Sequence, residues 1–397
     1  MRLPIFLMLI LLFVSGLVDF YIYRLIKSKR WKRVHVIVSV LLAVYLIVSI
    51  SIPRRNGSDQ QLQSVMWLLF VYLSIYIPKI LCVIVALIGE LPRLWRKRRW
   101  KAMTAAGVVV GVVTFVATWW GALVNRYNID VVEQTFEFER LPQSFDGYKI
   151  ALFSDFHVGT YGTDTAFVSK AVDKINSLNA DAIFFLGDIV NRQTDELRPF
   201  VRPLSRLRAP DGVISILGNH DYGDYRDWPS PADRKANNED LYLLNEKMGW
   251  QLLRNQTRYI TRDSDSIAII GVENCGDPPF SVYGSLRKSY DGSFNDDRFK
   301  ILLTHNPAHW AREVCLHDTI RIDLTFSGHT HAMQVSTTIG GKRYSPAALR
   351  YPNWGGRYDD GTGRTLYVNI GIGTVGLPMR VGATPEITLV TLRRKNQ

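Results

Sequence analysis

The chain has 397 residues, which is enough for two or three folded units. Hydrophobic residues make up 47% of the chain and aromatic residues 12%, so a disordered protein is excluded. The chain contains three cysteines, an odd number, and they lie far apart in the sequence, at Cys82, Cys275 and Cys315. A disulfide framework and a cysteine-based zinc site are therefore not expected.

The formal net charge of +12 is confined to the first third of the chain. Residues 1–124 contain 16 Lys and Arg against 3 Asp and Glu, a balance of +13. Residues 125–397 contain 32 against 33, a balance of −1. Because the larger part of the chain has no excess of basic residues, nucleic acid is not a predicted partner.

Four apolar stretches within residues 1–124 are long enough to cross a bilayer. They cover residues 3–23, 34–52, 65–88 and 102–123, to within a few residues at each end. A signal peptide would explain the first stretch alone, but it lacks a clear small-x-small cleavage site and three more stretches follow. Buried core helices would explain all four, but strongly charged loops separate them. We predict a transmembrane region with four helices, whose partner is the lipid bilayer.

The loops between these stretches predict their orientation. The first loop contains five Lys and Arg within residues 27–33, and the third contains six within residues 93–101. The second loop holds only two, Arg54 and Arg55. Short loops rich in Lys and Arg stay in the cytoplasm, so the first and third loops are expected there. With an even number of spans, residues 125–397 are then predicted to lie outside the cytoplasm, on a multi-pass inner-membrane anchor.

Two features lie inside the predicted spans. Asp19 and Lys79 would both fall in the cytoplasmic half of the bilayer, where charges are costly unless they are paired. We favour a structural pair, and a path for a polar substrate is the alternative. Gly107 and Gly111 form a G-x-x-x-G pattern, which would let a neighbouring helix approach closely.

Residues 148–397 have the pattern of one α/β domain. Short apolar runs that end in polar residues predict strands within 148–155, 181–188, 212–221, 299–307 and 321–331. Helical spacing of apolar residues predicts a helix over 167–178. Residues 125–147 are predicted to be a linker with an edge strand within 132–141, and the tail over 342–394 to form antiparallel strands.

Polar residues follow five of these strands, at the ends where open α/β sheets form their sites. They are Asp155-Phe156-His157, Gly187-Asp188, Gly218-Asn219-His220-Asp221, Thr304-His305 and Gly328-His329-Thr330-His331. Five of the eight histidines of the chain are among them. Carboxylate and imidazole ligands suit Mn, Fe, Zn or similar divalent ions, and glycine lets the backbone turn close to an ion. Two ions that share a bridging carboxylate would activate a water for attack on phosphorus.

The ordered set D-x-H, G-D, G-N-H-D, H and G-H-x-H resembles the calcineurin-like metallophosphoesterase superfamily, over about residues 130–395. The resemblance implies a four-layer α/β/β/α sandwich and two divalent metal ions (Mn, Fe or Zn). It assigns the first ion to Asp155, His157 and His331, the second to Asn219, His305 and His329, and the bridging position to Asp188. His220 would stabilise charge on a phosphoryl oxygen or protonate the leaving oxygen, and Asp221 would hold His220 in orientation.

Two motifs of this chain differ from those of the family's protein phosphatases, so protein dephosphorylation is not the favoured activity. Those enzymes read G-D-x-V-D-R-G and G-N-H-E, whereas this chain has Asn191 and Gln193 in the first motif and Asp221 in the second. The segments LPQSFDGYKIALFSDFHVG and NIGIGTVGLPMRVGATPEITLVTL are similar to those of bacterial membrane-associated phosphoesterases. That branch includes phosphodiesterases and pyrophosphatases of lipid-linked or nucleotide-sugar substrates, such as the UDP-diacylglucosamine pyrophosphatases.

Three further residues are candidates for binding the substrate. Arg192 follows the metal motif directly, and Trp354 and Arg357 lie in a Gly-rich segment where Arg357 would grip a second phosphate. A solvated loop is the alternative for all three. His309 and His317 lie outside the motifs, in a predicted helix, and are expected at the surface.

The sequence therefore predicts a membrane-anchored dinuclear-metal phosphoesterase that hydrolyses phosphodiester or pyrophosphate bonds. Anchoring at the bilayer favours a phospholipid or lipid-linked substrate over a soluble small molecule, although the anchor would equally serve only to retain the domain. A broad phosphomonoesterase or nucleotidase is one alternative, and a non-catalytic membrane sensor of a phosphorylated ligand is another. The presence of His220 disfavours the sensor, because binding alone does not require it.

Overall fold

The computed structural model describes residues 5–395 and divides the chain into two compact units. The membrane unit comprises the residues up to Val124 together with the segment Gly376–Val381. The α/β unit comprises Asn125–Val375 and the residues from Gly382 onward.

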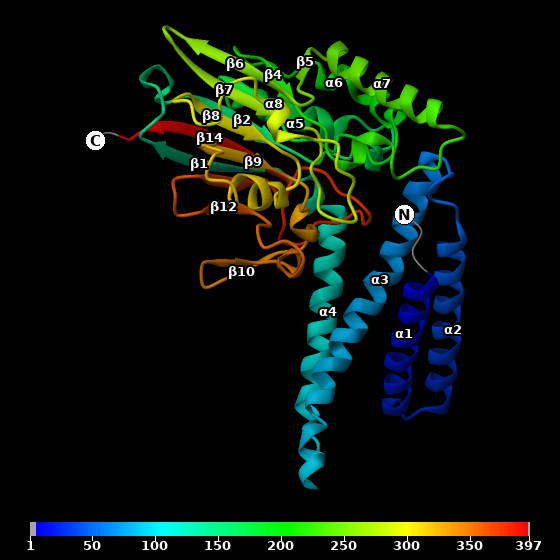
Figure 1. Ribbon diagram of the computed structural model, residues 1–397. Coiled ribbons are helices and arrows are strands. Elements are labelled where there is room, and N and C mark those ends of the chain that lie inside the picture. Colours follow the sequence, from blue (N-terminus) through cyan, green and yellow to red (C-terminus); the bar gives the residue numbers. More distant parts are fainter. Residues whose placement is uncertain (1–4, 396–397) are drawn as a thin grey trace. The chain divides into compact units, whose positions relative to one another are not determined.

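Four helices of the membrane unit are long and apolar enough to cross a membrane. They are α1 (Ile5–Leu25), α2 (Lys29–Ser51), α3 (Asp59–Ile88) and α4 (Lys101–Leu123), blue to cyan in Figure 1. The four predicted spans are confirmed as helices. Helix α3 begins earlier than the apolar stretch because Ser58 accepts a hydrogen bond from the backbone amide of Gln61, whose side chain bonds back to the amide of Ser58.

Helices α3 and α4 approach each other closely at two glycines, as the G-x-x-x-G spacing predicts. A Cβ atom at Gly107 would lie 2.4 Å from the carbonyl oxygen of Cys82. A Cβ atom at Gly111 would lie 3.1 Å from the carbonyl oxygen of Pro78. No larger residue fits at Gly107 unless one of the two backbones moves.

The two charges within the spans are paired, which confirms the expected ion pair. Lys79 Nζ lies 2.7 Å from Asp19 Oδ1. The hydroxyl of Tyr76 donates to the other carboxylate oxygen of Asp19 at 2.8 Å. This arrangement is the structural pair that lowers the cost of charge at membrane depth.

The α/β unit contains two six-stranded sheets. The first has the order β1 (Asp130–Phe138), β14 (Glu386–Arg394), β2 (Lys149–Phe153), β3 (Ala182–Phe185), β4 (Val213–Ser215) and β5 (Trp250–Leu252). The second has the order β12 (Gly356–Asp359), β13 (Thr365–Val368), β9 (Leu324–Ser327), β8 (Phe299–Leu303), β7 (Asp265–Gly271) and β6 (Gln256–Arg262). Strands β10 (Thr337–Ile339) and β11 (Lys342–Tyr344) form a separate hairpin.

The two sheets pack face to face, with helices on their outer faces. The core between them contains Ile150 and Phe184 from the first sheet and Ile301 and Phe326 from the second, all fully buried. Helices α5 (Ala166–Ser177), α6 (Val201–Leu204) and α7 (Pro231–Lys247) cover the first sheet, and α8 (Leu286–Ser289) with a π-helical turn (Trp310–Val314) covers the second. The predicted four-layer α/β/β/α order is present, since one core lies between the sheets and one lies under each helical layer.

Short 3-10 helices connect these elements. They span Leu91–Trp95, Asn125–Tyr127, Gln143–Phe145, Val158–Tyr161, Thr194–Phe200, Asn219–Tyr222, His331–Gln334 and Pro346–Leu349. Three of them begin at or just after predicted site residues, because the chain turns sharply where a strand ends and its polar side chains begin.

The predicted strands within 148–331 correspond to β2, β3, β4, β8 and β9, and the predicted edge strand is β1. The prediction of antiparallel strands in the tail is only partly right. Strand β12 pairs antiparallel with β13, but β13 runs parallel to β9, and β14 runs parallel to β1 while it pairs antiparallel with β2. The polar and apolar alternation of a strand does not reveal the direction of its neighbour.

Candidate metal centre

The predicted ligand residues follow the carboxyl ends of five strands. They are Asp155 and His157 after β2, Asp188 after β3, Asn219 after β4, His305 after β8, and His329 and His331 after β9. Strands β2, β3 and β4 are parallel in one sheet, and β8 and β9 are parallel in the other. The structure therefore gathers these side chains where the carboxyl ends of the two sheets meet.

The carboxylates and imidazoles form two groups that share one residue. The first group is Asp155, His157, Asp188 and His331, and the second is Asp188, His305 and His329. Within each group one donor atom of every residue lies within 4.8 Å of the others, and all of these residues are buried. Asn219 lies beside them, since the next backbone amide, that of His220, donates to Asp188 Oδ1 at 2.8 Å. Asp188 is the residue that the two groups have in common.

Three of the histidines use one ring nitrogen for a hydrogen bond, which leaves the other nitrogen to face the centre. Nδ1 of His305 donates to the carbonyl oxygen of Leu186 at 2.8 Å, so Nε2 is the nitrogen that faces the centre. His157 is arranged in the same way, with Nδ1 3.2 Å from a main-chain carbonyl oxygen. His329 is reversed, because its Nε2 lies 3.2 Å from the Tyr351 hydroxyl and its Nδ1 faces the centre.

The donor atoms converge in a way that fits a bound cation. Nε2 of His157 lies 3.1 Å from Nε2 of His331, and Nε2 of His331 lies 3.2 Å from Asp155 Oδ1. Nε2 of His305 lies 3.1 Å from Asp188 Oδ2. Among the described residues the buried Oδ1 atom of Asn219 has no hydrogen-bond partner, which leaves it free to act as a ligand.

The negative charges of the buried carboxylates favour positively charged groups in this centre. Burial alone would lower the pKa of His305, but the charges of Asp188 and Asp155 raise it to about 9. Burial and the neighbouring His305 lower the pKa of His329 to about 3, so this imidazole stays neutral and keeps a lone pair to donate. Carboxylate, imidazole and amide oxygen donors together suit Mn, Fe or Zn.

Two glycines of the motifs are required by close contacts with the carboxylates. A Cβ atom at Gly218 would lie 2.2 Å from Asp188 Oδ1, and one at Gly328 would lie 2.6 Å from Asp155 Oδ2. Neither position accepts a side chain while the carboxylates keep their places.

His220 lies at the rim of the centre, held by contacts that the sequence did not indicate. Its Nδ1 donates to the carbonyl oxygen of Asn191 at 2.7 Å, so Nε2 is the nitrogen left to act on a substrate. Its ring stacks on that of Tyr225, with centroids 4.0 Å apart and planes 13° from parallel. The Tyr225 hydroxyl also accepts a hydrogen bond from Nδ2 of Asn219 at 2.7 Å, which turns Oδ1 of that amide the other way.

The expectation that Asp221 orients His220 is wrong. The Asp221 carboxylate instead accepts hydrogen bonds from the backbone amides of Asp188 (2.8 Å), Ile189 (3.0 Å) and Gly218 (2.9 Å). Asp221 is buried and fixes the loop that presents Asp188, so it acts on the ligand loop rather than on the imidazole.

Aromatic residues that the sequence analysis missed surround His329. The ring of Phe280 meets its imidazole edge to face, with centroids 4.6 Å apart. The Tyr351 ring lies on another side, at 5.3 Å. Neither residue belongs to a motif, and 49 and 22 positions separate them from His329 in the sequence, so only the folded chain brings them together.

Arg192 and Trp354, the first two predicted substrate contacts, are buried near the centre. The guanidinium of Arg192 is 3% exposed and lies 3.7 Å from the carboxylate of Glu196. Trp354 is 8% exposed, and its carbonyl oxygen accepts a hydrogen bond from the hydroxyl of Thr330, between two of the predicted ligands. The Trp354 side chain packs in a buried cluster with Ala332, which follows His331.

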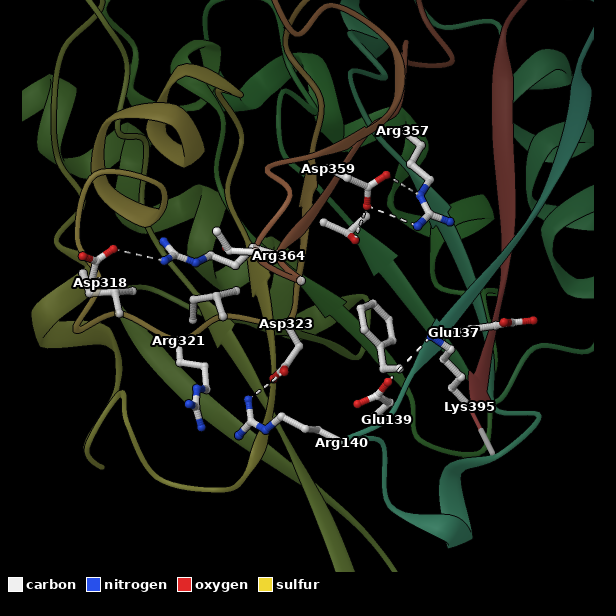
Figure 2. A pocket seen from close by; sticks show the side chains of 16 residues that line it. Glu137, Glu139, Arg140, Asp318, Arg321, Asp323, Arg357, Asp359, Arg364 and Lys395 are labelled. Carbon is white, nitrogen blue, oxygen red and sulfur yellow. Dashed lines mark hydrogen bonds and ion pairs between the residues drawn. The ribbon is translucent and has the colours of Figure 1, made fainter. Parts of the chain in front are cut away.

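The structure does not bring Arg357 to the metal ligands. Strand β12 pairs antiparallel with β13, so its residues run away from the carboxyl end of that strand. Arg357 is paired with Asp359 at 3.0 Å and lines a cavity of about 580 Å³ beside Arg321 and Asp323, which precede β9 rather than follow it (Figure 2). Acidic and basic side chains alternate around this cavity and pair with one another (Figure 2).

His309 is not at the surface, contrary to expectation, whereas His317 is exposed as predicted. His309 is 2% exposed, with Nδ1 2.9 Å from the hydroxyl of Thr304 and Nε2 2.9 Å from Glu313. It buries its ring against the strand that leads to His305 and satisfies both nitrogens there.

Two family models match the chain. The model described as "Probable Calcineurin-like phosphoesterase, transmembrane domain" matches residues 1–126. The model described as "Calcineurin-like phosphoesterase" matches residues 148–333, which include every predicted metal ligand.

Similar proteins occur in bacteria and animals. The uncharacterized metallophosphoesterase YkuE of Bacillus subtilis is 33% identical over 283 residues, which are 69% of this chain and 88% of that protein. A transmembrane protein with metallophosphoesterase domain from Danio rerio is 29% identical over 72% of this chain, and the match spans 62% of its own length. A transmembrane protein with metallophosphoesterase domain from Bos taurus is 30% identical over 64% of this chain, and the match spans 55% of its own length.

Proposed function

Because the chain belongs to the calcineurin-like metallophosphoesterase family and is a metal-dependent phosphoric ester hydrolase with transmembrane helices, we propose that it cleaves phosphodiester or pyrophosphate bonds. The observation that carries this proposal is the pair of donor groups that share Asp188. Two ions held by a common carboxylate are suited to displacement at phosphorus, because they act on the attacking and the leaving oxygen.

We infer the following roles for the residues of the centre. Asp155, His157 and His331 would hold one ion, Asn219, His305 and His329 would hold the other, and Asp188 would be shared by the two. Bound there, two divalent ions supply a nucleophilic water and neutralise charge on the phosphoryl oxygens. The imidazole of His220 presents Nε2, which stabilises a phosphoryl oxygen or passes a proton to the leaving oxygen.

The substrate class that we propose is a phospholipid or a lipid-linked diphosphate. Four helices long enough to cross a membrane hold the enzyme at the bilayer, which raises its encounter rate with substrates of the same membrane. Broad hydrolysis of phosphomonoesters is the second candidate, since the same two-ion centre also serves monoesters.

We also propose that the α/β unit lies outside the cytoplasm, on the inner membrane. The support is the charge of the short loops, with Lys and Arg concentrated between α1 and α2 and between α3 and α4. Such loops resist translocation.

The reaction class is tested with the full chain in detergent, stripped of metal and resupplied with Mn²⁺. We expect hydrolysis of bis-p-nitrophenyl phosphate to return with the metal and to be lost in Asp188→Asn, which weakens the bridging ligand. Asp263→Asn is the matched control, because Asp263 is exposed in the turn between β6 and β7. A preference for p-nitrophenyl phosphate would favour the monoesterase.

His220→Ala separates an enzyme from a sensor that only binds a phosphorylated ligand. We expect turnover to fall by about 10²–10⁴-fold with both metals retained, because His220 acts on the substrate rather than on the ions. Metal content measured by elemental analysis provides the second reading. Unchanged turnover in this variant would contradict the role proposed for His220.

A further inference from the structure

The hairpin formed by β10 and β11 is exposed along its whole length. All six residues of the two strands are exposed, and the glycines at the turn, Gly340 and Gly341, have open space around them. A two-stranded ribbon with no third strand and no covering helix is at best marginally stable in water. Its surface is therefore expected to meet something besides solvent.

The hairpin and its flanks concentrate the exposed apolar surface of the α/β unit. Seven large apolar side chains are exposed among the described residues of this unit, and four of them lie within residues 333–349. They are Met333 (44% exposed), Ile339 (66%), Tyr344 (47%) and Leu349 (93%). Clustered exposed apolar residues mark a contact surface, whereas single ones are ordinary.

The same segment has an excess of basic residues in a unit that is close to neutral overall. Residues 333–350 contain Lys342, Arg343 and Arg350 and no acidic residue, but the guanidinium of Arg350 is paired with Asp277 at 2.6 Å. The register places Ile339 opposite Lys342, so these two side chains share one face of the ribbon with Tyr344. Mixed basic, aromatic and aliphatic side chains on one face are typical of segments that lie in the interface of an anionic bilayer.

The other face of the ribbon turns toward the body of the domain. Arg343 belongs to that face, and its guanidinium lies 3.9 Å from the carboxylate of Glu386 and over the ring of Trp354. The cation that faces outward with the apolar residues is therefore Lys342, whose Nζ lies 5.8 Å from the ring centroid of Tyr344.

The base of the hairpin is part of the loop that carries two predicted metal ligands. The hydroxyl of Ser345 donates to the carbonyl oxygen of Ala332 at 2.6 Å, and Ala332 follows His331 directly. Ala332 and Ala347 are fully buried in one small cluster. Four residues after Ala347, the chain reaches Tyr351, whose hydroxyl lies 3.2 Å from Nε2 of His329. The ribbon thus projects from the rim of the metal centre.

We propose that residues 333–350 form a bilayer-contact surface that lies in the headgroup layer of a membrane containing anionic phospholipid. A bilayer is the fitting occupant because the outward cation Lys342 lies among exposed apolar side chains, and because the chain itself carries four helices long and apolar enough to span a membrane. The rim of the metal centre is then held at the headgroup layer, where the phosphates of lipids lie. This second step rests on the proposed function. It would let the phosphoester groups of lipids reach the metal centre while the lipids stay in the membrane.

The contact is tested by fluorescence in proteoliposomes of phosphatidylcholine with about one third phosphatidylglycerol. Full-length variants Ile339→Cys and Leu349→Cys, in a background with Cys82, Cys275 and Cys315 changed to Ala, are labelled with a nitrobenzoxadiazole dye. Leu243→Cys and Leu316→Cys are the matched controls, since both side chains are exposed and apolar but lie elsewhere on the α/β unit. Doxyl-labelled phosphatidylcholine serves as the quencher.

We expect quenching of at least about twofold at positions 339 and 349 and little at 243 and 316, and a weaker effect at 339 when Lys342→Glu is added. Equal quenching at all four positions would overturn the proposal. Hydrolysis of bis-p-nitrophenyl phosphate by the same samples reports on the proposed function separately. Quenching without hydrolysis would support the bilayer contact and contradict the proposed phosphoesterase activity. Hydrolysis without quenching would support the activity and contradict the bilayer contact.

Discussion

Five of the predicted metal ligands hold a left-handed backbone conformation that residues other than glycine rarely adopt. They are Asp155 (φ 52°), His157 (47°), Asp188 (61°), His329 (76°) and His331 (50°). Such conformations cost on the order of 1–3 kcal/mol each and persist only where the surroundings impose them. The strain is concentrated at the ends of the strands, where it aims donor atoms at a common point.

Tyr225 is a positioning residue for two groups at once, and its two contacts are separable by mutation. Tyr225→Phe removes the hydroxyl that holds the amide of Asn219, so we expect Mn²⁺ to bind about 10- to 100-fold more weakly, with turnover recovered at saturating metal. Tyr225→Leu also removes the ring that packs on His220, and turnover should then stay low at saturating metal. Titration of Mn²⁺ by calorimetry and by the hydrolysis rate distinguishes the two effects.

Tyr259→Phe is the control for the loss of a hydroxyl. Tyr259 lies on the outer strand β6 and its hydroxyl donates to Asp291, and no metal ligand takes part in that contact. Its Mn²⁺ affinity should equal that of the unchanged protein. If Tyr225→Phe behaved in the same way, Tyr225 would have no role in orienting Asn219.

Residues within motifs were predictable, and residues that act from outside the motifs were not. Asp, His and Asn follow the predicted strands in an order that resembles the motifs of the family, so the seven ligand candidates could be named from the sequence. The orienting groups of His220 are a main-chain carbonyl and the ring of Tyr225, and neither has a sequence pattern. The misassignment of Asp221 has the same origin, because a carboxylate beside an imidazole in sequence bonds to whichever donors the fold supplies.

At the scale of elements, the contact of α3 with α4 depends on the absence of a side chain at Gly107. A Cβ atom there would meet the carbonyl oxygen of Cys82, so we expect Gly107→Ala to force the helices apart and to destabilise the membrane unit by about 1–3 kcal/mol. The melting temperature of the detergent-solubilised chain, followed by size-exclusion chromatography, should fall.

Gly16→Ala in α1 is the matched control, because nothing lies within 4 Å of a Cβ atom at that position. Alanine has the higher helix propensity, so this variant should melt at the same temperature or slightly above. A melting temperature for Gly107→Ala that matched Gly16→Ala would mean that α3 and α4 do not pack as described.

Elements covered on both faces were the easiest to predict from the sequence. Strands β2, β3, β8 and β9 lie between a helical layer and the other sheet, and each appears as a short continuous apolar run. Helix α7 and strand β6 were not predicted, because each has exposed positions and mixed polar residues along its length. These elements contain few apolar residues, so the periodicity that predicts a helix or a strand is weak in them. Strand β7 was not predicted either, although it is a largely buried apolar run.

At the scale of the whole molecule, the division of charge matches the division into units. The excess of 13 basic charges lies within residues 1–124, and the α/β unit is close to neutral. The helix bounds refine this distribution, since α2 begins at Lys29 and α4 at Lys101, which places the basic clusters at helix ends. Basic residues at the ends of spans determine which loops remain in the cytoplasm.

Orientation is tested by reporter fusions at three points of the full chain in a bacterial host. Alkaline phosphatase, which is active only outside the cytoplasm, should be active when fused after Gly57 or at the C-terminus and inactive after Lys97, and green fluorescent protein should give the opposite pattern. The fusions at Gly57 and Lys97 test the two loops independently of the α/β unit. Fluorescence at the C-terminus together with active phosphatase at Gly57 would place the α/β unit in the cytoplasm. Nucleotide-sugar lipids made on the cytoplasmic face would then replace phospholipids and lipid-linked diphosphates as the leading candidate substrates.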